Sequence, residues 1–213
     1  MSLLKPLRLL SMLTVIFAVY SSSHTLAAVL QPANAKNTQR CVQYFEINGQ
    51  SYCTNQASAK TPDLKGALDR EKNTFGFDGR HWRLGWWNQQ ASQPMLEYVV
   101  GSETVEGWTE LVTSQFFPDL QKRLTPGQFM TVAMEEMVKQ GFQPKLHIIA
   151  KSPESILYEW NIDNHPVENQ HELQRIFVGP NGLHVLHYCS RPTMTEEHRA
   201  VWLKILSQAK VKS

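Results

Sequence analysis

The sequence predicts an α+β fold with a central antiparallel β-sheet flanked by helices. Three patterns favour this class. Some segments alternate between apolar and polar residues, as half-buried antiparallel strands do. Others carry apolar residues at helical spacing behind capping residues. Strands and helices also come in runs rather than in strict alternation: a β-hairpin, two strands, two helices, four strands and one helix.

The first 27 residues have the layout of a secretory signal peptide. Lys5 and Arg8 precede an apolar run over 9–20, and small residues lead to Ala27, where a signal peptidase could cut. This run is shorter than the about 20 residues that a membrane-spanning helix needs. We therefore expect a cleaved leader (1–27), a flexible lead-in (28–40) and a single domain (41–213). The product is expected to be periplasmic or secreted, without stable membrane insertion.

Two of the three cysteines lie close together in the sequence. Cys41 and Cys53 flank Asn48-Gly49, the strongest short signal for a hairpin. In an exported protein this spacing predicts a disulfide between them. The fit is imperfect, because a two-residue turn at Asn48-Gly49 places Cys53 opposite Tyr44. The alternative is two separate thiols. Cys189 is interpreted as a buried, inert thiol in an apolar strand.

Two paired strands are expected over 81–87 and 94–100. In the first, strict alternation places His81, Arg83 and Trp87 on one face, which is polar by composition. If that face is exposed, Trp87 could stack on a ligand. These three residues are therefore the candidate binding surface. The alternative is that helices cover both faces and the tryptophans belong to the core.

Three helices are expected after these strands. Apolar residues at helical spacing predict a helix from about Glu103 to Phe117, stopped by Pro118. The second helix begins at Thr125-Pro126-Gly127-Gln128, which combines an N-cap, a proline and a capping-box glutamine, and ends near Gly141. The last opens at Thr193, with Glu196 in the capping-box position. The second helix carries an apolar stripe that we interpret as core rather than as an adaptable binding surface: Phe129, Met130, Ala133, Met134 and Met137.

Four strands are expected between the last two helices. They cover 146–150, 156–162, 173–178 and 183–189, and the turn Gly179-Pro180-Asn181-Gly182 joins the last pair.

The charge balance argues against a nucleic-acid partner. The leader holds two of the 21 basic residues and none of the 19 acidic ones, so the rest of the chain has equal numbers of each. Nucleic-acid binding relies on clustered Lys and Arg. We therefore expect a protein or small-molecule partner and no nucleic acid.

The carboxyl-terminal part of the chain resembles the PsbP-like superfamily, in particular its DcrB-like branch of small exported bacterial proteins. The resemblance is carried by Leu157-Tyr158-Glu159-Trp160, Arg175-Ile176-Phe177-Val178, the strand from Gly182 to Tyr188, and the closing helix with Trp202. It covers about 130 residues from His81 onward. It implies an α/β/α sandwich and a non-enzymatic binding or assembly role. The amino-terminal cysteine hairpin departs from the pattern, and a fold does not fix a function.

Few residue patterns point to catalysis. His171-Glu172 begins like a metalloprotease motif, but Arg175 stands where the second histidine is needed. His184 and His187 are three apart on a strand and so point to opposite faces. His165, Glu168, His171 and Glu172 are interpreted as a solvated loop rather than a metal site. A Cys189–His187 pair is too far apart for direct proton transfer. We therefore assign no catalytic residue, no metal and no cofactor.

These observations predict an exported, non-catalytic binding or accessory protein. The alternatives are a secreted hydrolase whose site is assembled only in the fold, and an effector delivered to another cell.

Overall fold

The computed structural model describes residues 31–32, 43–47, 50–54, 64–88, 93–163, 169–191 and 194–213, with side chains from residue 66 onward. The expected leader (1–27), most of the lead-in (28–40) and Cys41 lie outside these residues. No helix in the described part of the chain combines the length and the apolar character needed to cross a bilayer.

A small three-stranded sheet contains the predicted hairpin. Strand β2 (Gln43–Ile47) pairs antiparallel with β3 (Gln50–Thr54). Strand β1 (Gln31–Pro32), within the expected lead-in, pairs with the other side of β3. The register places Tyr44 opposite Cys53, as the Asn48-Gly49 turn predicts. Because Cys41 is not among the described residues, its disulfide with Cys53 stays a prediction.

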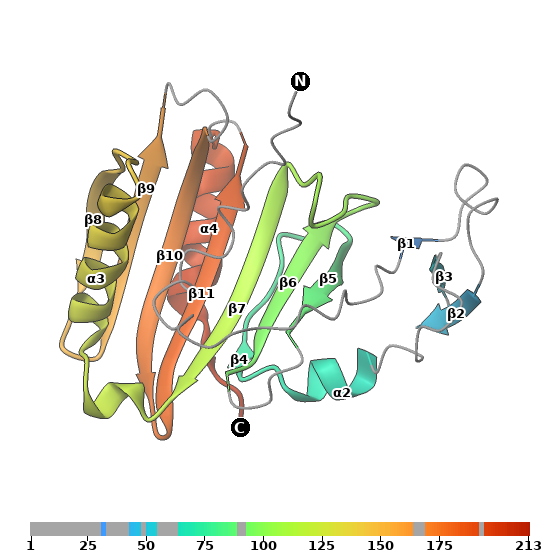
Figure 1. Ribbon diagram of the computed structural model, residues 1–213, viewed down its shortest axis with the longest axis horizontal. Coiled ribbons are helices and arrows are strands. Elements are labelled where there is room, and N and C mark those ends of the chain that lie inside the picture. Colours follow the sequence, from blue (N-terminus) through green and yellow to red (C-terminus); the bar gives the residue numbers. More distant parts are fainter. Residues whose placement is uncertain are drawn as a thin grey trace.

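The main body is a seven-stranded antiparallel sheet in the order β5-β6-β7-β11-β10-β9-β8 (Figure 1). The predicted pairing of 81–87 with 94–100 is confirmed as β5 with β6. The bounds are β5 Trp82–Trp87, β6 Met95–Val100, β7 Glu110–Pro118, β8 Lys145–Lys151, β9 Ser155–Ile162, β10 Gln170–Gly179 and β11 Gly182–Ser190.

Short elements complete the described chain. Helix α2 (Leu64–Asp69) leads to β4 (Asn73–Thr74), which pairs with β12 (Lys210–Val211) near the carboxyl end. The 3-10 helix η3 (Leu120–Lys122) follows β7.

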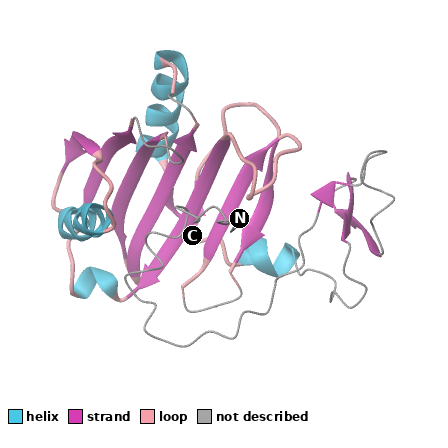
Figure 2. Cartoon of the chain, turned by 45° about the horizontal axis from the view of Figure 1, so that its top comes forward, coloured by secondary structure: helices cyan, strands magenta, loops and turns pink. Residues whose placement is uncertain are grey.

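The predicted fold class, an α+β sandwich flanked by helices, is wrong. Strands dominate the described residues, and helices are few (Figure 2). The main error is the helix expected over 103–117, where the structure has turns and then the central strand β7. Leu111, Val112 and Ser114 are all buried, because β7 is covered on both faces. A strand of this kind loses its apolar–polar alternation and can match helical spacing by chance.

Two helices pack against the sheet, one on each side. Helix α3 (Pro126–Lys139) has the predicted capping box, in which Thr125 and Gln128 exchange hydrogen bonds. It packs against β9 and β10. Helix α4 (Glu196–Gln208) is capped by Thr195 rather than by Thr193, and it packs against β10 and β11. Neither helix spans the whole sheet, so helical layers of the expected kind are lacking in the described chain (Figure 1).

The two faces of the sheet carry separate apolar cores. On the α3 face, Phe129, Met130 and Met137 of the helix pack with Tyr158, Trp160 and neighbouring strand residues. On the α4 face, Trp202 and Leu206 pack with Trp82, Tyr98, Tyr188 and others. Each core thus lies between one helix and one face of the sheet.

Candidate functional site

The structure separates the three residues of the predicted binding surface. His81 is exposed and lies just before β5. Arg83 is 7% exposed and faces inward, where its Nε donates to the Gly101 carbonyl oxygen at 3.1 Å and its guanidinium also bonds the Glu103 carbonyl. Trp87 packs against the core of the α4 face. Arg83 and Trp87 therefore lie on opposite faces of the sheet, and the predicted shared face is wrong.

A β-bulge at Gly85 causes this separation. The pairing of β5 with β6 shifts between Leu84 and Trp86, so Gly85 is an extra residue in the strand. A side chain there would crowd its neighbours, because a Cβ on Gly85 would lie 3.1 Å from methyl groups of both Val99 and Val105. Each residue after a bulge moves to the other face. A glycine inside a strand pattern was the sequence signal for this shift.

A row of polar side chains crosses the α3 face. The strand register aligns five residues from β6 to β9: Glu97, Thr113, His187, Gln174 and Tyr158. All are buried except His187, which is half-buried.

His187 and His184 do point to opposite faces, as their spacing predicts. His187 reaches Glu172, whereas His184 lies between aromatic rings on the α4 face.

Cys189 lies in this polar region, but its surroundings do not suit a nucleophile. Its thiol donates to Glu172 Oε2 at 2.7 Å, and His187 Nδ1 lies 3.1 Å from the other oxygen of the same carboxylate. Burial, together with the negative charge of Glu172, raises the pKa of the Cys189 thiol well above its usual value. A catalytic cysteine needs the opposite shift. Cys189 is thus a buried, free thiol, which confirms the interpretation from the sequence.

On the α4 face of the sheet, Glu159 of β9 joins helix α4 to the strands. Its carboxylate accepts from Arg199 Nε at 2.6 Å and from Arg199 Nη2 at 2.8 Å, and it also contacts His147 and His171. The Arg199 bonds are the main cause that lowers the pKa of Glu159 to about 2. A paired arginine of this kind fixes geometry rather than transferring protons. We interpret this cluster as structural.

The histidine and carboxylate residues around 165–172 do not form a site in the described chain. His171 turns to Glu159 and its neighbour Glu172 turns to Cys189, on opposite faces of β10. His165 and Glu168 lie outside the described residues. Across the part of the chain that the structure describes, no three His, Cys, Asp or Glu side chains gather closely enough to hold a metal ion.

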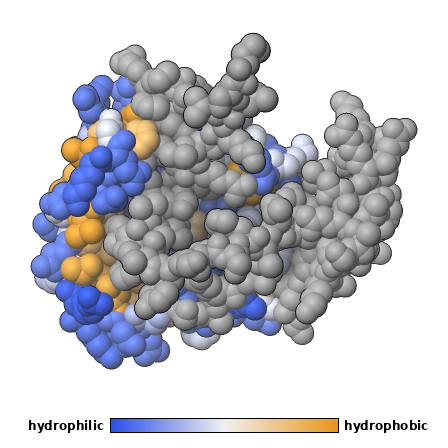
Figure 3. Space-filling model, in the orientation of Figure 1, coloured by the Kyte–Doolittle hydropathy of each residue, from blue (hydrophilic) through white to orange (hydrophobic). Residues whose placement is uncertain are grey.

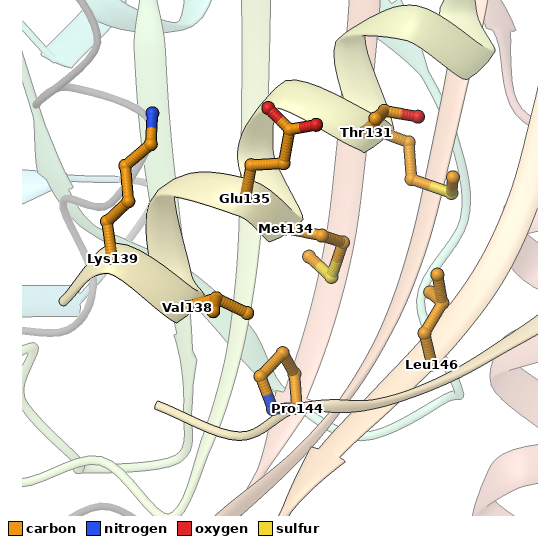
Figure 4. A pocket seen from close by; sticks show the side chains of 8 residues that line it. Thr131, Met134, Glu135, Val138, Lys139, Pro144 and Leu146 are labelled. Atoms are coloured by element: carbon orange, nitrogen blue, oxygen red, sulfur yellow. The ribbon is translucent and has the colours of Figure 1, made fainter. Parts of the chain in front are cut away.

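An open apolar groove, which no sequence pattern predicted, lies between α3 and β8. Its volume is about 550 Å³, within the range of ligand sites. Met134 and Val138 of α3 point toward Pro144 and Leu146, while Glu135 and Lys139 point outward along the rim (Figure 4). Met130 and Thr131 complete the lining. The α3–β8 groove, defined by these eight residues, is the candidate binding site.

Apolar side chains continue beyond the groove onto the surface. Val138 is 60% exposed, and Leu146 and Ile148 are each 41% exposed. Hydrophobic residues gather along this side of the molecule between hydrophilic ones (Figure 3). Contiguous apolar surface with a polar rim is typical of an interaction site.

The methionines of α3 divide between two roles. Met130 and Met137 are buried in the core of the α3 face, as expected for the apolar stripe. Met134 is only partly buried, and it lines the groove. A flexible thioether at such a position suits a surface that adapts to its ligand. The stripe predicted as core therefore also supplies part of the candidate site.

No protein-family model matches the chain, so the resemblance to the PsbP-like superfamily stays a prediction. No curated protein matches the chain either.

Proposed function

We propose that this chain is an exported binding protein, without catalytic activity, that holds an apolar group of its partner in the α3–β8 groove. The groove itself is the observation that supports this function most directly, because exposed apolar side chains line it and charged groups stand only at its rim. Transfer of an apolar group from water into such a site is favourable by about 25 cal/mol for each Å² of apolar surface buried.

The surroundings of Cys189 argue against a cysteine hydrolase. A cysteine hydrolase needs a thiolate beside a base, whereas the Cys189 thiol keeps its proton and donates a hydrogen bond to the Glu172 carboxylate. The hydrogen bond between Cys189 and Glu172 therefore supports a structural role for this buried pair.

Binding of Nile red, a neutral apolar fluorophore, tests the groove. Val138→Asn should weaken the dye's affinity about fivefold, because a polar amide replaces apolar surface that the dye covers. The matched control is Val132→Asn, on the same helix but outside the lining and 37% exposed. Fluorescence titration gives both dissociation constants. If Nile red has equal dissociation constants for the two variants, the dye does not bind in the groove.

Mass spectrometry of the exported protein tests its compartment. The proposal expects the chain to begin at Ala28 and, without reduction, to contain a peptide pair linked through Cys41 and Cys53. Such a bridge stabilises mainly by constraining the unfolded chain, by about 3 kcal/mol. Reduction should separate the pair. Intact protein with residues 1–27 retained and both thiols alkylated would contradict export.

A further inference from the structure

The outer side of strand β8 is open to another strand. In the described chain β8 has a single neighbour, β9, and ends the sheet order. An edge strand carries unpaired backbone N–H and C=O groups along its free side. An extended polypeptide can pair with such an edge and thereby join the sheet.

The side chains of β8 on the α3 face follow a simple order. Leu146 pairs with Trp160, Ile148 with Tyr158 and Lys151 with Ile156. These three partners all belong to the core under α3. The bulge between Ile148 and Ala150 shifts the alternation and so keeps Lys151 on this face. The groove side of β8 therefore presents two apolar residues followed by one lysine.

We propose that the partner is an extended polypeptide segment that adds to β8 as an eighth, antiparallel strand, with alternate apolar side chains in the α3–β8 groove and an acidic residue beside Lys151. This inference rests on the proposed function of the groove. Neighbouring strands lie about 4.8 Å apart. The added strand would thus place every second side chain next to Leu146 and Ile148, along the flank of α3 that carries Met134 and Val138.

The charges of β8 favour an acidic partner over a second copy of this chain. The strand reads Lys-Leu-His-Ile-Ile-Ala-Lys and has no carboxylate of its own. Lys145 and His147 already contact Asp163 and Glu159. Lys151 has no ion pair with any other described residue, so its charge is free to meet a carboxylate. Two paired β8 strands would instead bring the lysines of both copies together with no carboxylate between them.

A short synthetic peptide tests this inference. The probe is a blocked, fluorescein-labelled heptapeptide that begins with glutamate and continues with alternating threonine and valine, so that the glutamate and the valines share one face of the strand. Antiparallel pairing places its first residue beside Lys151, at the end of β8. A second peptide with alternate backbone amides N-methylated cannot form the strand hydrogen bonds. We expect fluorescence anisotropy to show about tenfold weaker binding for the methylated peptide.

A charge exchange tests the acidic position. Lys151→Glu should weaken binding of the glutamate peptide about threefold and strengthen binding of a peptide that begins with lysine, as one exposed charge pair does. Lys204→Glu, on the exposed side of α4, is the control and should change neither. If Lys151→Glu and Lys204→Glu change the peptide affinities equally, the partner does not place an acidic residue beside Lys151.

The outcomes separate this inference from the proposed function. If methylation leaves peptide affinity unchanged while Val138→Asn still weakens Nile red, the groove binds apolar groups but no strand adds to β8. If neither the dye nor the peptide responds to Val138→Asn, the proposed function itself fails. If sedimentation shows a dimer that Leu146→Lys dissociates, a second copy occupies the edge and the inference is wrong.

Discussion

Replacing Trp202 with alanine should destabilise the protein by about 4 kcal/mol, the largest effect we expect from any single substitution here. The indole is fully buried in the core of the α4 face. It stacks on Tyr188, with ring centroids 4.1 Å apart, and meets Trp82 edge-to-face at 5.3 Å. Alanine would leave a cavity that the surrounding strands are too rigid to close. Urea unfolding of the two proteins measures the difference in free energy.

Trp202→Phe separates the role of the stacked ring from that of the indole nitrogen. Within the described residues, Trp202 Nε1 is buried without a hydrogen-bond partner. Phenylalanine removes that unsatisfied donor and keeps an aromatic ring, so we expect a loss of only about 1 kcal/mol. Val201→Ala is the control on the same helix, at a residue that is 39% exposed. A loss below about 1 kcal/mol for Trp202→Ala would show that this stack does not hold α4 to the sheet.

Local signals predicted single elements well. The Thr125–Gln128 capping box marks the start of α3 because both hydrogen bonds form within one turn. The Gly179–Gly182 segment joins β10 to β11 through a tight turn. In each case the residues that carry the signal also make the contacts that determine the structure.

Errors arose where distant residues decide the outcome. Trp108 and Leu111 match a helix in spacing, yet they pack with Val99 and Cys189 at one end of the α3 face. Strand β7 lies between β6 and β11, and its side chains enter apolar cores on both faces of the sheet, Leu111 and Phe117 on one face and Val112 on the other. Sequence spacing within 103–117 carries no information about those neighbours. The resulting error in one central element changed the predicted fold class.

The candidate site depends even more on long-range arrangement. The strand from Leu146 to Ala150 was predicted, but its place at the edge follows only from the order of all seven strands. The exposed side chains of Val138 and Leu146 would be ordinary core residues if another strand lay beyond β8. The predicted surface at His81, Arg83 and Trp87 failed for a related reason, since one bulge at Gly85 redirects Trp87.

The second large effect expected is a loss of stability in mild acid, caused by His184. This residue is 2% exposed and lies between the rings of Phe116 and Phe177. Its Nδ1 lies 2.9 Å from Asn73 Oδ1. The Asn73 amide nitrogen faces Ser114 Oγ and the Gln115 carbonyl, which fixes its oxygen toward His184. Nδ1 must therefore be the donor, and Nε2 is the nitrogen that would take up a proton.

Protonation of His184 has no compensating partner in the described structure. A Cβ on Gly179 would collide with Nε2, so the backbone packs closely there. Burial, with a contribution from the positive charge of Lys72, lowers the pKa of His184 from 6.5 to about 4. Because the folded-state pKa lies below the unfolded value, the stability is fully present above pH 6.5 and is lost as the pH falls toward 4.

Urea unfolding at two pH values measures this linkage. Between about pH 7.5 and about pH 5, His184 should lower the free energy of unfolding by about 2 kcal/mol. His184→Gln retains an amide donor for Asn73 but cannot titrate. Its free energy of unfolding should therefore fall by about 2 kcal/mol less than that of the original protein between the two pH values. His81→Gln, at an exposed position, should keep the pH dependence of the original protein. If His184→Gln and the original protein lose equal stability over this interval, the acid sensitivity lies in another residue and His184 already accommodates its charge in the fold.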